Sequence, residues 1–266
     1  MQFPSTPNEW KGIAENFLKA WQLPHCCGSI DGKHVLMVCP KNSGSLNFNY
    51  KGTFSNVLLA VADANYKFLY IDYGHYGSES DGGIFRKVQF GQMMETCRLN
   101  LPNDDYLPNS EIMFPFYFIG DEAFPLKRNL MRPYPRRSAI SRSQRVYNYR
   151  LCRARRVVEN AFGILSSRFR IFKRPLTYSE GNTTKMVLAA CILHNFLIRE
   201  SACYINAGDC DSEDEHGNLI PGRWRATDDQ MRSCTQVASN MYSTEARELR
   251  NKLADYLCTT GSCHRQ

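Results

Sequence analysis

The residues Ile119-Gly120-Asp121-Glu122-Ala123-Phe124 end an apolar stretch of the chain on a pair of acids. The preceding residues, 112–119, are mostly apolar or aromatic and predict a buried central strand, although Pro115 weakens this prediction for the first half. Asp121 would then follow the carboxyl end of the strand, where ligands collect in open α/β sheets. A lone aspartate after a strand is more often a turn residue or a helix cap, so the rest of the chain must decide its role.

The segments before this strand predict a lead-in helix followed by an antiparallel meander. The apolar residues of 8–22 share one helical stripe that is closed by Pro24. Asp31 lies at or near the start of the first strand region, and Ser80 to Gly83 offer an N-cap for a helix of about three turns, for which Asp81 is a capping candidate. The expected strands are residues 35–38, 53–63 and 67–73.

The segments after the central strand are mostly helical. A long connection that contains several prolines, residues 127–143, precedes a helix that begins near Gln144 and carries Glu159 at the edge of its buried face. Helices are also expected over 186–198 and 244–257. The acids of residues 209–215 do not have the spacing of a calcium-binding loop, and we interpret them as a solvated loop.

The order of these elements is that of an α/β, ribonuclease H-like mixed sheet flanked by helices, with a C-terminal helical extension. In that fold the first and fourth strands are neighbours, which would place Asp31 beside Asp121 and allow Glu159 to approach from the following helix. Three carboxylates cost energy together unless cations neutralise them. Two Mg²⁺ or Mn²⁺ ions would do so, and would polarise a phosphodiester and activate water.

Composition indicates a folded intracellular protein. The 266 residues are 43% hydrophobic, and the start of the chain lacks the pattern of a signal peptide. We see no apolar run of membrane-spanning length and therefore expect no membrane partner. The eleven cysteines are an odd, scattered number without a C-x-x-C pair, which favours reduced thiols over disulfides or zinc.

The charge of the chain is concentrated in one block. Residues 127–174 contain fifteen lysines and arginines but one acid, Glu159, within a chain whose formal charge is only +7. The remaining residues are therefore net acidic. A basic block of this density favours a polyanion partner, most simply nucleic acid, over a solvated helical face, which usually mixes both signs.

Four blocks, together with Leu193-His194-Asn195, resemble the PIF/Harbinger DDE transposases and the Harbinger transposase-derived nucleases. The likeness runs from about Gly28 to Arg199. The blocks are residues 28–34, which include Asp31; 77–85, which include Asp81; 120–126, which include Asp121; and 149–163, which include Glu159.

This resemblance implies a divalent metal, DNA strand cleavage and a catalytic, metal-binding triad of Asp31, Asp121 and Glu159. It also implies a nuclear setting, with the cytoplasm as a second compartment, and a separate Myb-like DNA-binding partner protein. Six basic residues near the triad are candidates for contact with nucleic acid: Lys33, His34, Arg150, Arg153, Arg155 and Arg156. His34 suits a packed strand equally well, and Arg155 or Arg156 could instead pair with Glu159.

We divide the chain into a lead-in helix (1–24, the remnant of an N-terminal region), a DDE catalytic domain (25–200), and an acidic loop with a C-terminal helix (201–266). The main hypothesis is a metal-dependent DNA endonuclease or transposase domain. The alternative is a catalytically silent, domesticated protein that binds DNA or a partner without cutting. An RNA-directed hydrolase is weaker, because nothing resembles an RNA-reading module.

Overall fold

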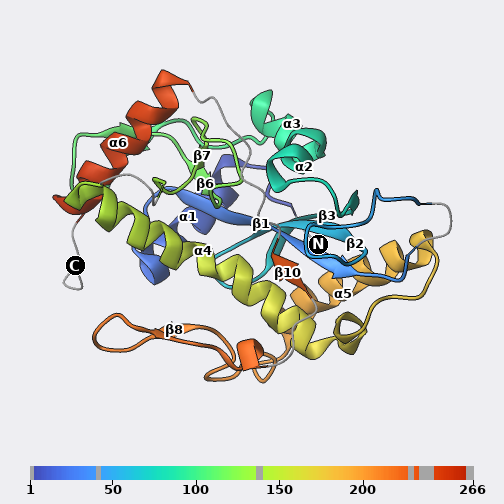
Figure 1. Cartoon of the computed structure of the whole chain (residues 1–266). Helices are drawn as coiled ribbons and strands as arrows, with labels where there is room; N and C mark the ends of the chain where they lie inside the picture. Colours follow the sequence, from blue (N-terminus) through green and yellow to red (C-terminus); the bar gives the residue numbers. More distant parts are fainter. Residues whose placement is uncertain (1–2, 40–42, 136–139, 227–230, 234–242, 262–266) are drawn as a thin grey trace.

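A mixed sheet in the order β3-β2-β1-β6-β7 forms the centre of the molecule (Figure 1). The structure is a computed structural model that describes residues 3–39, 43–135, 140–226, 231–233 and 243–261. The strands of the sheet are β1 (Cys26–Leu36), β2 (Ser55–Ala62), β3 (Phe68–Tyr76), β6 (Tyr117–Ile119) and β7 (Leu130–Met131). The first three are antiparallel, whereas β1, β6 and β7 run parallel. The predicted ribonuclease H-like α/β fold is confirmed, including the pairing of β1 with β6.

The expected eight-residue strand over 112–119 is interrupted at its proline. Residues Met113–Phe114 form β5, which pairs with β4 (Asp105–Tyr106) in a separate ribbon. Pro115 follows β5, and only β6, which is fully buried, joins the central sheet. A proline cannot donate a ladder hydrogen bond, which explains why the strand divides here. The residue of interest, Asp121, still follows the carboxyl end of a central strand.

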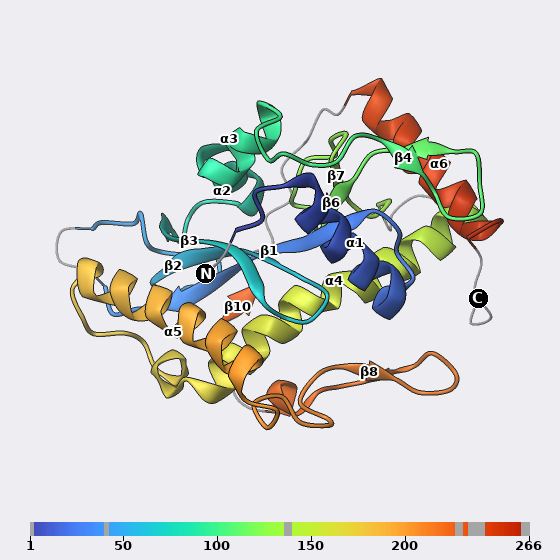
Figure 2. The same cartoon turned by 180° about the vertical axis from the view of Figure 1, so that it is seen from behind.

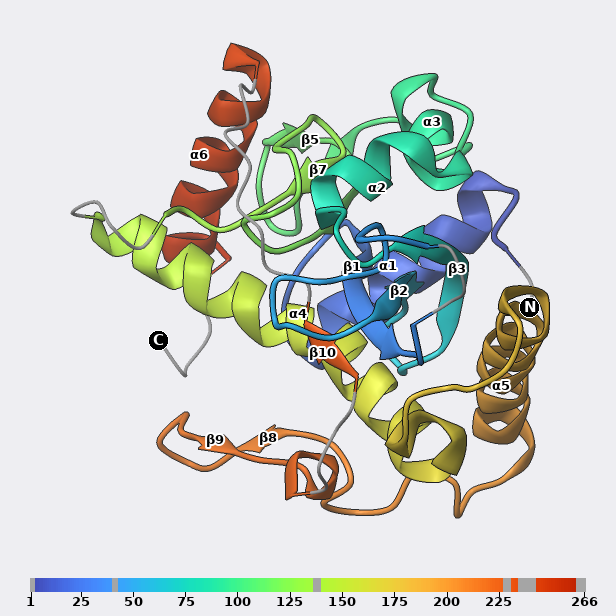
Figure 3. The same ribbon diagram turned by 45° about the vertical axis from the view of Figure 1, so that its right-hand side comes forward.

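Helices cover both faces of the sheet. On one face, residues of α1 (Pro7–Trp21), α2 (Asp81–Lys87) and α3 (Gln89–Glu95) pack with β1, β2 and β6. The single helix of about three turns expected after Ser80 is thus two helices, with Val88 in extended conformation between them. On the other face, α4 (Arg142–Arg168) and α5 (Glu180–Glu200) pack against β2 and β3. Figure 2 shows α1 in front of the sheet, and Figure 3 shows α4 crossing the opposite side.

Local sequence signals explain where α1 and α4 begin. The side chain of Thr6 accepts a hydrogen bond from the Glu9 backbone N–H, and the Glu9 side chain returns to the cap, with Pro7 in the first turn of α1. Ser141 and Gln144 form the same reciprocal box at the start of α4. These caps satisfy backbone N–H groups that have no partner within the helix.

The C-terminal region adds elements around α4. The predicted last helix is confirmed as α6 (Thr244–Cys258), which packs against α4 in the same core as α1. Between α5 and α6 lie the β8–β9 hairpin (Ser212–Glu213 and Leu219–Ile220) and two short elements, η2 (Arg223–Ala226) and β10 (Arg232–Ser233). The remaining short helix is η1 (Arg170–Lys173). Among the described residues, no helix is both long and apolar enough to cross a membrane.

The middle of β1 is open on one edge. Residues Cys26 to Ser29 pair with β6, and Lys33 and His34 pair with β10 on the same side. Between them, Ile30, Asp31 and Gly32 pair with neither of these strands, although they pair with β2 on the other side. This gap at the end of β6 leaves room for side chains to reach Asp31.

Candidate metal centre

Three aspartates meet at the open edge of β1. One carboxylate oxygen each from Asp31, Asp81 and Asp121 lies within 4.8 Å of the other two. Asp31 comes from the middle of β1, Asp81 from the first turn of α2, and Asp121 from the loop after β6. The expectation that Asp31 and Asp121 become neighbours is thus matched by the structure, and the third member of the group is Asp81.

Gly32 makes the approach of Asp81 possible. A Cβ atom at position 32 would lie 2.1 Å from Oδ1 of Asp81, far inside van der Waals contact. Only glycine therefore lets the Asp81 carboxylate reach the β1 backbone. Gly82 plays a similar part on α2, because a Cβ there would lie 2.5 Å from the carbonyl oxygen of Ala123. Two glycines thus bring α2 against β1 and against the loop that carries Asp121.

Asp81 corrects our interpretation of the segment before α2. The sequence favoured a capping role for Asp81, but the side chain of Ser80 accepts the capping hydrogen bond from the Gly83 backbone N–H. Asp81 is instead fully buried and turned toward Asp31. One signal was available: Ser80 alone suffices as a cap, which leaves the adjacent acid without a local role.

The electrostatics of the group suit a cation. Burial raises the pKa of Asp31 to about 6, and the charges of Asp121 and Glu159 add to the rise against the opposing effect of Lys33 and Arg155. Burial likewise raises the pKa of Asp121, whose Oδ1 accepts the Ala123 backbone N–H at 2.8 Å. Oδ2 of Asp31 is buried and accepts no hydrogen bond from the described residues. Buried carboxylate oxygens of this kind are the ligands that Mg²⁺ and Mn²⁺ prefer, so this group fits a metal ion.

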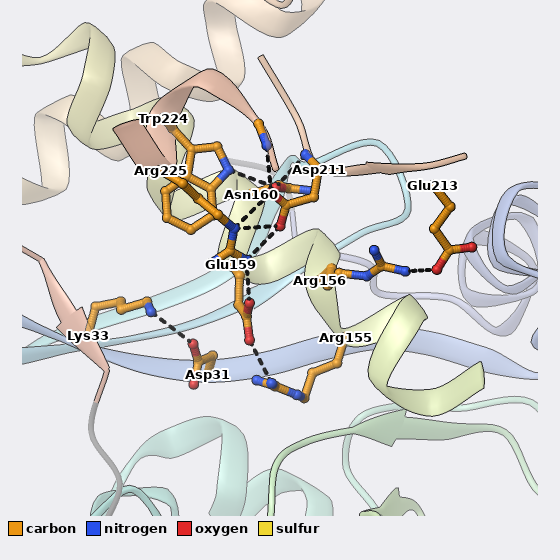
Figure 4. A network of polar contacts seen from close by, with 11 residues as sticks. Asp31, Lys33, Arg155, Arg156, Glu159, Asn160, Asp211, Glu213, Trp224 and Arg225 are labelled. Atoms are coloured by element: carbon orange, nitrogen blue, oxygen red, sulfur yellow. Dashed lines mark hydrogen bonds and ion pairs between the residues drawn. The ribbon is translucent and has the colours of Figure 1, made fainter. Parts of the chain in front are cut away.

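Glu159 points toward Asp31 from α4 but is held by arginines (Figure 4). Its Oε1 lies 2.6 Å from Nη2 of Arg155, and its Oε2 lies 3.2 Å from Nη2 of Arg225. Burial opposes the ionisation of Glu159, but Arg155, Lys33 and Arg225 outweigh it and hold its pKa below the usual value. The structure therefore places Glu159 beside the three aspartates as an ion-paired carboxylate.

A polar network behind Glu159 fixes Arg225 (Figure 4). The guanidinium of Arg225 donates from Nε and Nη2 to the carboxylate of Asp211, with distances of 2.6 to 3.1 Å. The side-chain oxygen of Asn160 accepts hydrogen bonds from Nε1 of Trp224 at 2.9 Å and from the backbone N–H of Asp211 at 3.1 Å. The segment after α5 is thereby tied to the helix turn that carries Glu159.

Two acids of the segment 209–215, Asp211 and Glu213, are enclosed rather than solvated as the sequence predicted, whereas Glu215 is exposed. Asp211 is 5% exposed, and the side chain of Glu213 is 6% exposed. Glu213 forms ion pairs with Arg156 and, at 3.0 Å, with Nε of Arg153. The expectation failed because the partners of these acids are distant in the chain: Glu213 meets Arg153 and Arg156 of α4, more than fifty residues earlier, and Asp211 meets Arg225, which lies beyond the hairpin.

The six basic candidates for nucleic-acid contact divide into two groups. Lys33, His34 and Arg150 are buried, and Nζ of Lys33 lies 3.7 Å from Oδ2 of Asp31. Burial lowers the pKa of His34 to about 4, and its Nδ1 lies 2.9 Å from the hydroxyl of Ser55, as expected of a packed strand residue.

The other three, Arg153, Arg155 and Arg156, line a pocket of about 330 Å³ between α4 and the β8–β9 hairpin, together with Arg225, Glu159 and Glu213. Their role in binding nucleic acid stays a prediction. Two further arginines of the basic block, Arg136 and Arg137, lie outside the described residues.

A mixed sheet of this order, with three aspartates clustered beside β1, is the arrangement of a ribonuclease H-like domain with a candidate metal centre. The chain matches the family described as DDE superfamily endonuclease over residues 30–195, which is more than half of its length. The chain belongs to this family.

Curated relatives extend the likeness beyond the family region. The chain is 29% identical over 263 residues to "Protein ALP1-like" of Arabidopsis thaliana, a match that covers 97% of this chain and 60% of the relative. It is 25% identical over 200 residues to "Putative nuclease HARBI1" of Homo sapiens, covering 73% and 52% respectively. The chain thus spans about half to three fifths of these relatives. No solved structure matches it significantly.

Proposed function

We propose that the chain is the catalytic domain of a metal-dependent DNA endonuclease or transposase. The observation that carries this proposal is the meeting of Asp31, Asp81 and Asp121 from three separate segments of the chain. Membership of the DDE superfamily endonuclease family supports it independently. In this proposal the three aspartates hold Mg²⁺ or Mn²⁺, most simply as two ions, which would polarise the scissile phosphodiester and lower the pKa of the attacking water.

The side chains around the group have separate tasks. Lys33 and Arg155 keep positive charge next to Asp31 and so limit the repulsion among the carboxylates. Glu159, the third acid of the triad that the sequence predicts, would join the three aspartates only by leaving its ion pair with Arg155. Because a guanidinium binds phosphate in the same two-point geometry as carboxylate, a DNA phosphate is a suitable acceptor for Arg155 once Glu159 turns inward.

The partners and setting of the protein belong to the same proposal. DNA would approach along the arginine-lined pocket beside α4, and its binding would weaken steeply with salt because phosphate contacts release counterions. A Myb-like partner protein would supply target choice, and the protein would act in the nucleus. These three statements rest on the basic block and on the resemblance of the sequence blocks.

Nicking of a supercoiled plasmid tests the proposal. We expect the wild-type chain to nick in Mg²⁺ or Mn²⁺ but not in EDTA. Asp121→Asn and Asp81→Asn should lose about a hundredfold or more of this activity, because the metal supplies several kcal/mol of transition-state stabilisation. Asp255→Asn is the matched control, since Asp255 is an exposed carboxylate on α6.

Two outcomes would count against the proposal. Wild-type protein that binds DNA but never nicks, across metals and salt concentrations, would favour the silent, domesticated binder. Full activity in Asp81→Asn together with loss in Glu159→Gln would return the third ligand position to Glu159. Circular dichroism on each variant separates loss of chemistry from loss of fold.

A further inference from the structure

Helix α5 has two apolar sides, and only one of them packs against the sheet. Val187, Ala190 and Cys191 are buried against β2, β3 and α4. His194 is buried as well, and its ring nitrogens lie 2.8 Å from the hydroxyl of Tyr204 and 2.9 Å from the carbonyl of Tyr66. The amide of Asn195 pairs with the backbone N–H and carbonyl of Phe68 on β3. These contacts fix the rotation of α5 about its axis.

That rotation turns a second apolar stripe outward. Ile192, Leu193 and Phe196 are 48%, 48% and 49% exposed, although each is a large hydrophobic residue. Ala189, one turn earlier, is exposed on the same side. The three views place α5 at the rim of the molecule beside β3 (Figures 1 to 3). Contiguous exposed apolar residues on a helix that is otherwise packed mark an interaction surface.

The stripe is charged at its two ends, with opposite signs. Lys185 is exposed one turn before Ala189, and Glu200 is exposed one turn after Phe196, where its carboxylate also pairs with Nε of Arg199 at 2.6 Å. At 3.6 residues per turn, both fall close to the line of the stripe, whose midpoint lies between Ile192 and Leu193. The order along the helix is therefore cation, small residue, two large aliphatic residues, aromatic residue, acid.

This order is complementary to itself when it is reversed. In an antiparallel pair centred on the midpoint, Lys185 faces Glu200 of the second copy, Ala189 faces Phe196, and Ile192 faces Leu193. Small residues then meet large ones, and opposite charges meet at both ends. We propose that the outer face of α5 is an isologous interface with a second copy of this chain, related by a twofold axis.

A second copy explains the stripe better than an unrelated protein does. A different partner needs an apolar face, but it does not need Lys185 and Glu200 at equal distances from the midpoint. A single pair of helices buries less area than a standard stable interface, so the dimer is expected to be weak and dependent on concentration. The inference does not depend on nuclease activity.

Sedimentation velocity on the full 266-residue chain tests the interface over about a hundredfold range of concentration. Wild-type protein should shift from monomer toward dimer across this range. Phe196→Glu should weaken the dimer by about tenfold or more, because it replaces the largest apolar side chain of the stripe with a charge opposite Ala189 of the second copy. Lys185→Glu and Glu200→Lys should each weaken it about threefold, because each creates two like-charge pairs per dimer.

The double swap Lys185→Glu with Glu200→Lys decides the orientation. It should restore dimerisation to near the wild-type level, because only antiparallel self-pairing places these two positions opposite each other. Lys252→Glu, an exposed site on α6, is the matched control and should change nothing. A wild-type monomer at every concentration, a dimer insensitive to Phe196→Glu, or a double swap weaker than either single swap would each overturn the proposal.

Discussion

Two neighbouring sets of acidic side chains in this molecule differ in whether arginines neutralise them. Asp31, Asp81 and Asp121 bring their carboxylates together, and burial raises the pKa of Asp31 and Asp121. Asp211 is buried and Glu159 is 17% exposed, yet Arg155 and Arg225 pair with them, and the pKa of Glu159 is held low. The first set lowers the stability of the metal-free protein, whereas the second set is neutralised within the chain.

This difference distinguishes a candidate metal site, the three aspartates, from ion-paired acids that hold the backbone around it. Carboxylates that are buried together without enough positive charge are retained where a cation is bound, because they cost stability otherwise. Carboxylates that meet fixed guanidinium groups hold backbone segments in place. Here the segment after α5 is attached to α4 through Asp211, Arg225 and Trp224, directly behind Glu159. Variants that affect only one set test whether the two are independent.

The largest effect is expected from Gly163→Ala in the supporting network. A Cβ at position 163 would lie 2.2 Å from Cδ2 of Trp224, so the indole must move and its hydrogen bond to Asn160 is lost. We expect the free energy of unfolding to fall by about 3 kcal/mol in thermal denaturation. Stabilisation by Mn²⁺ should persist, because Trp224 is not a member of the aspartate group.

Gly12→Ala is the matched control for that substitution. Gly12 lies on α1, and nothing lies within 4 Å of a Cβ built there, so alanine should raise stability by up to about 1 kcal/mol. An unchanged thermal midpoint in Gly163→Ala would contradict the importance of the Trp224 contact. Loss of Mn²⁺ stabilisation with an otherwise intact fold would show that the two sets of acids are coupled.

A smaller effect of opposite sign is expected from Asp31→Asn. The folded-state pKa of Asp31, about 6, lies above its ordinary value of 3.8, so folding takes up a proton between these values. In the metal-free wild-type protein, the Asp31 carboxyl group therefore contributes fully to the free energy of unfolding below about pH 4. This contribution is lost as the pH rises through about 6. At pH 7.5 the neutral amide should raise metal-free stability by about 2 kcal/mol and flatten the pH dependence.

Mn²⁺ should make the wild-type protein more stable than Asp31→Asn, the reverse of the order expected without metal. The wild-type chain gains stability from the metal by mass action, whereas Asp31→Asn should gain little. Asp255→Asn, on the exposed side of α6, should follow the wild type at every pH. Thermal midpoints from pH 4 to pH 8, with and without metal, provide the measurement. A midpoint of Asp31→Asn below that of metal-free wild type would contradict the claim that this carboxylate is destabilising.

The sequence predicted the part of the site that depends on strand order. Asp31 and Asp121 were expected to be neighbours because the first and fourth strands of this fold pair, and β1 does pair with β6. Asp81 was misassigned because its position before a helix suits a cap. Its true surroundings depend on how closely α2 approaches β1, a distance that Gly32 permits but that no local pattern encodes.

Partners that are distant in sequence account for the other difference. The excess of arginine on α4 predicted a surface for nucleic acid, and the acids after α5 predicted a solvated loop. Arg156 and Glu213 in fact neutralise each other. The charge of each segment is evident from its own sequence. Neither sequence shows that α4 and the acids after α5 lie in contact. Packing of the β8–β9 hairpin against α4 is a tertiary event that composition does not reveal.

The smallest effect, and the finest test of the comparison, is expected from Arg225→Gln. The side chain of Arg225 is 35% exposed, and the glutamine amide can still donate to the buried carboxylate of Asp211, which also accepts the Gly222 backbone N–H, so the free energy of unfolding should fall by only about 1 kcal/mol. The same change removes a positive charge next to Glu159 and makes the region around Asp31 more negative. Mn²⁺ should consequently bind about two- to threefold more tightly, measured by calorimetric titration.

Arg223→Gln is the matched control for Arg225→Gln, because it removes a nearby arginine that does not pair with Glu159. Arg223 precedes Arg225 by two residues and pairs with Asp209, but its side chain is 65% exposed and it does not contact Glu159. We expect neither stability nor Mn²⁺ affinity to change measurably in this variant. If Arg225→Gln instead weakens Mn²⁺ binding, then Arg225 orients Glu159 for the metal rather than holding it away. The two sets of acids would then function as one site.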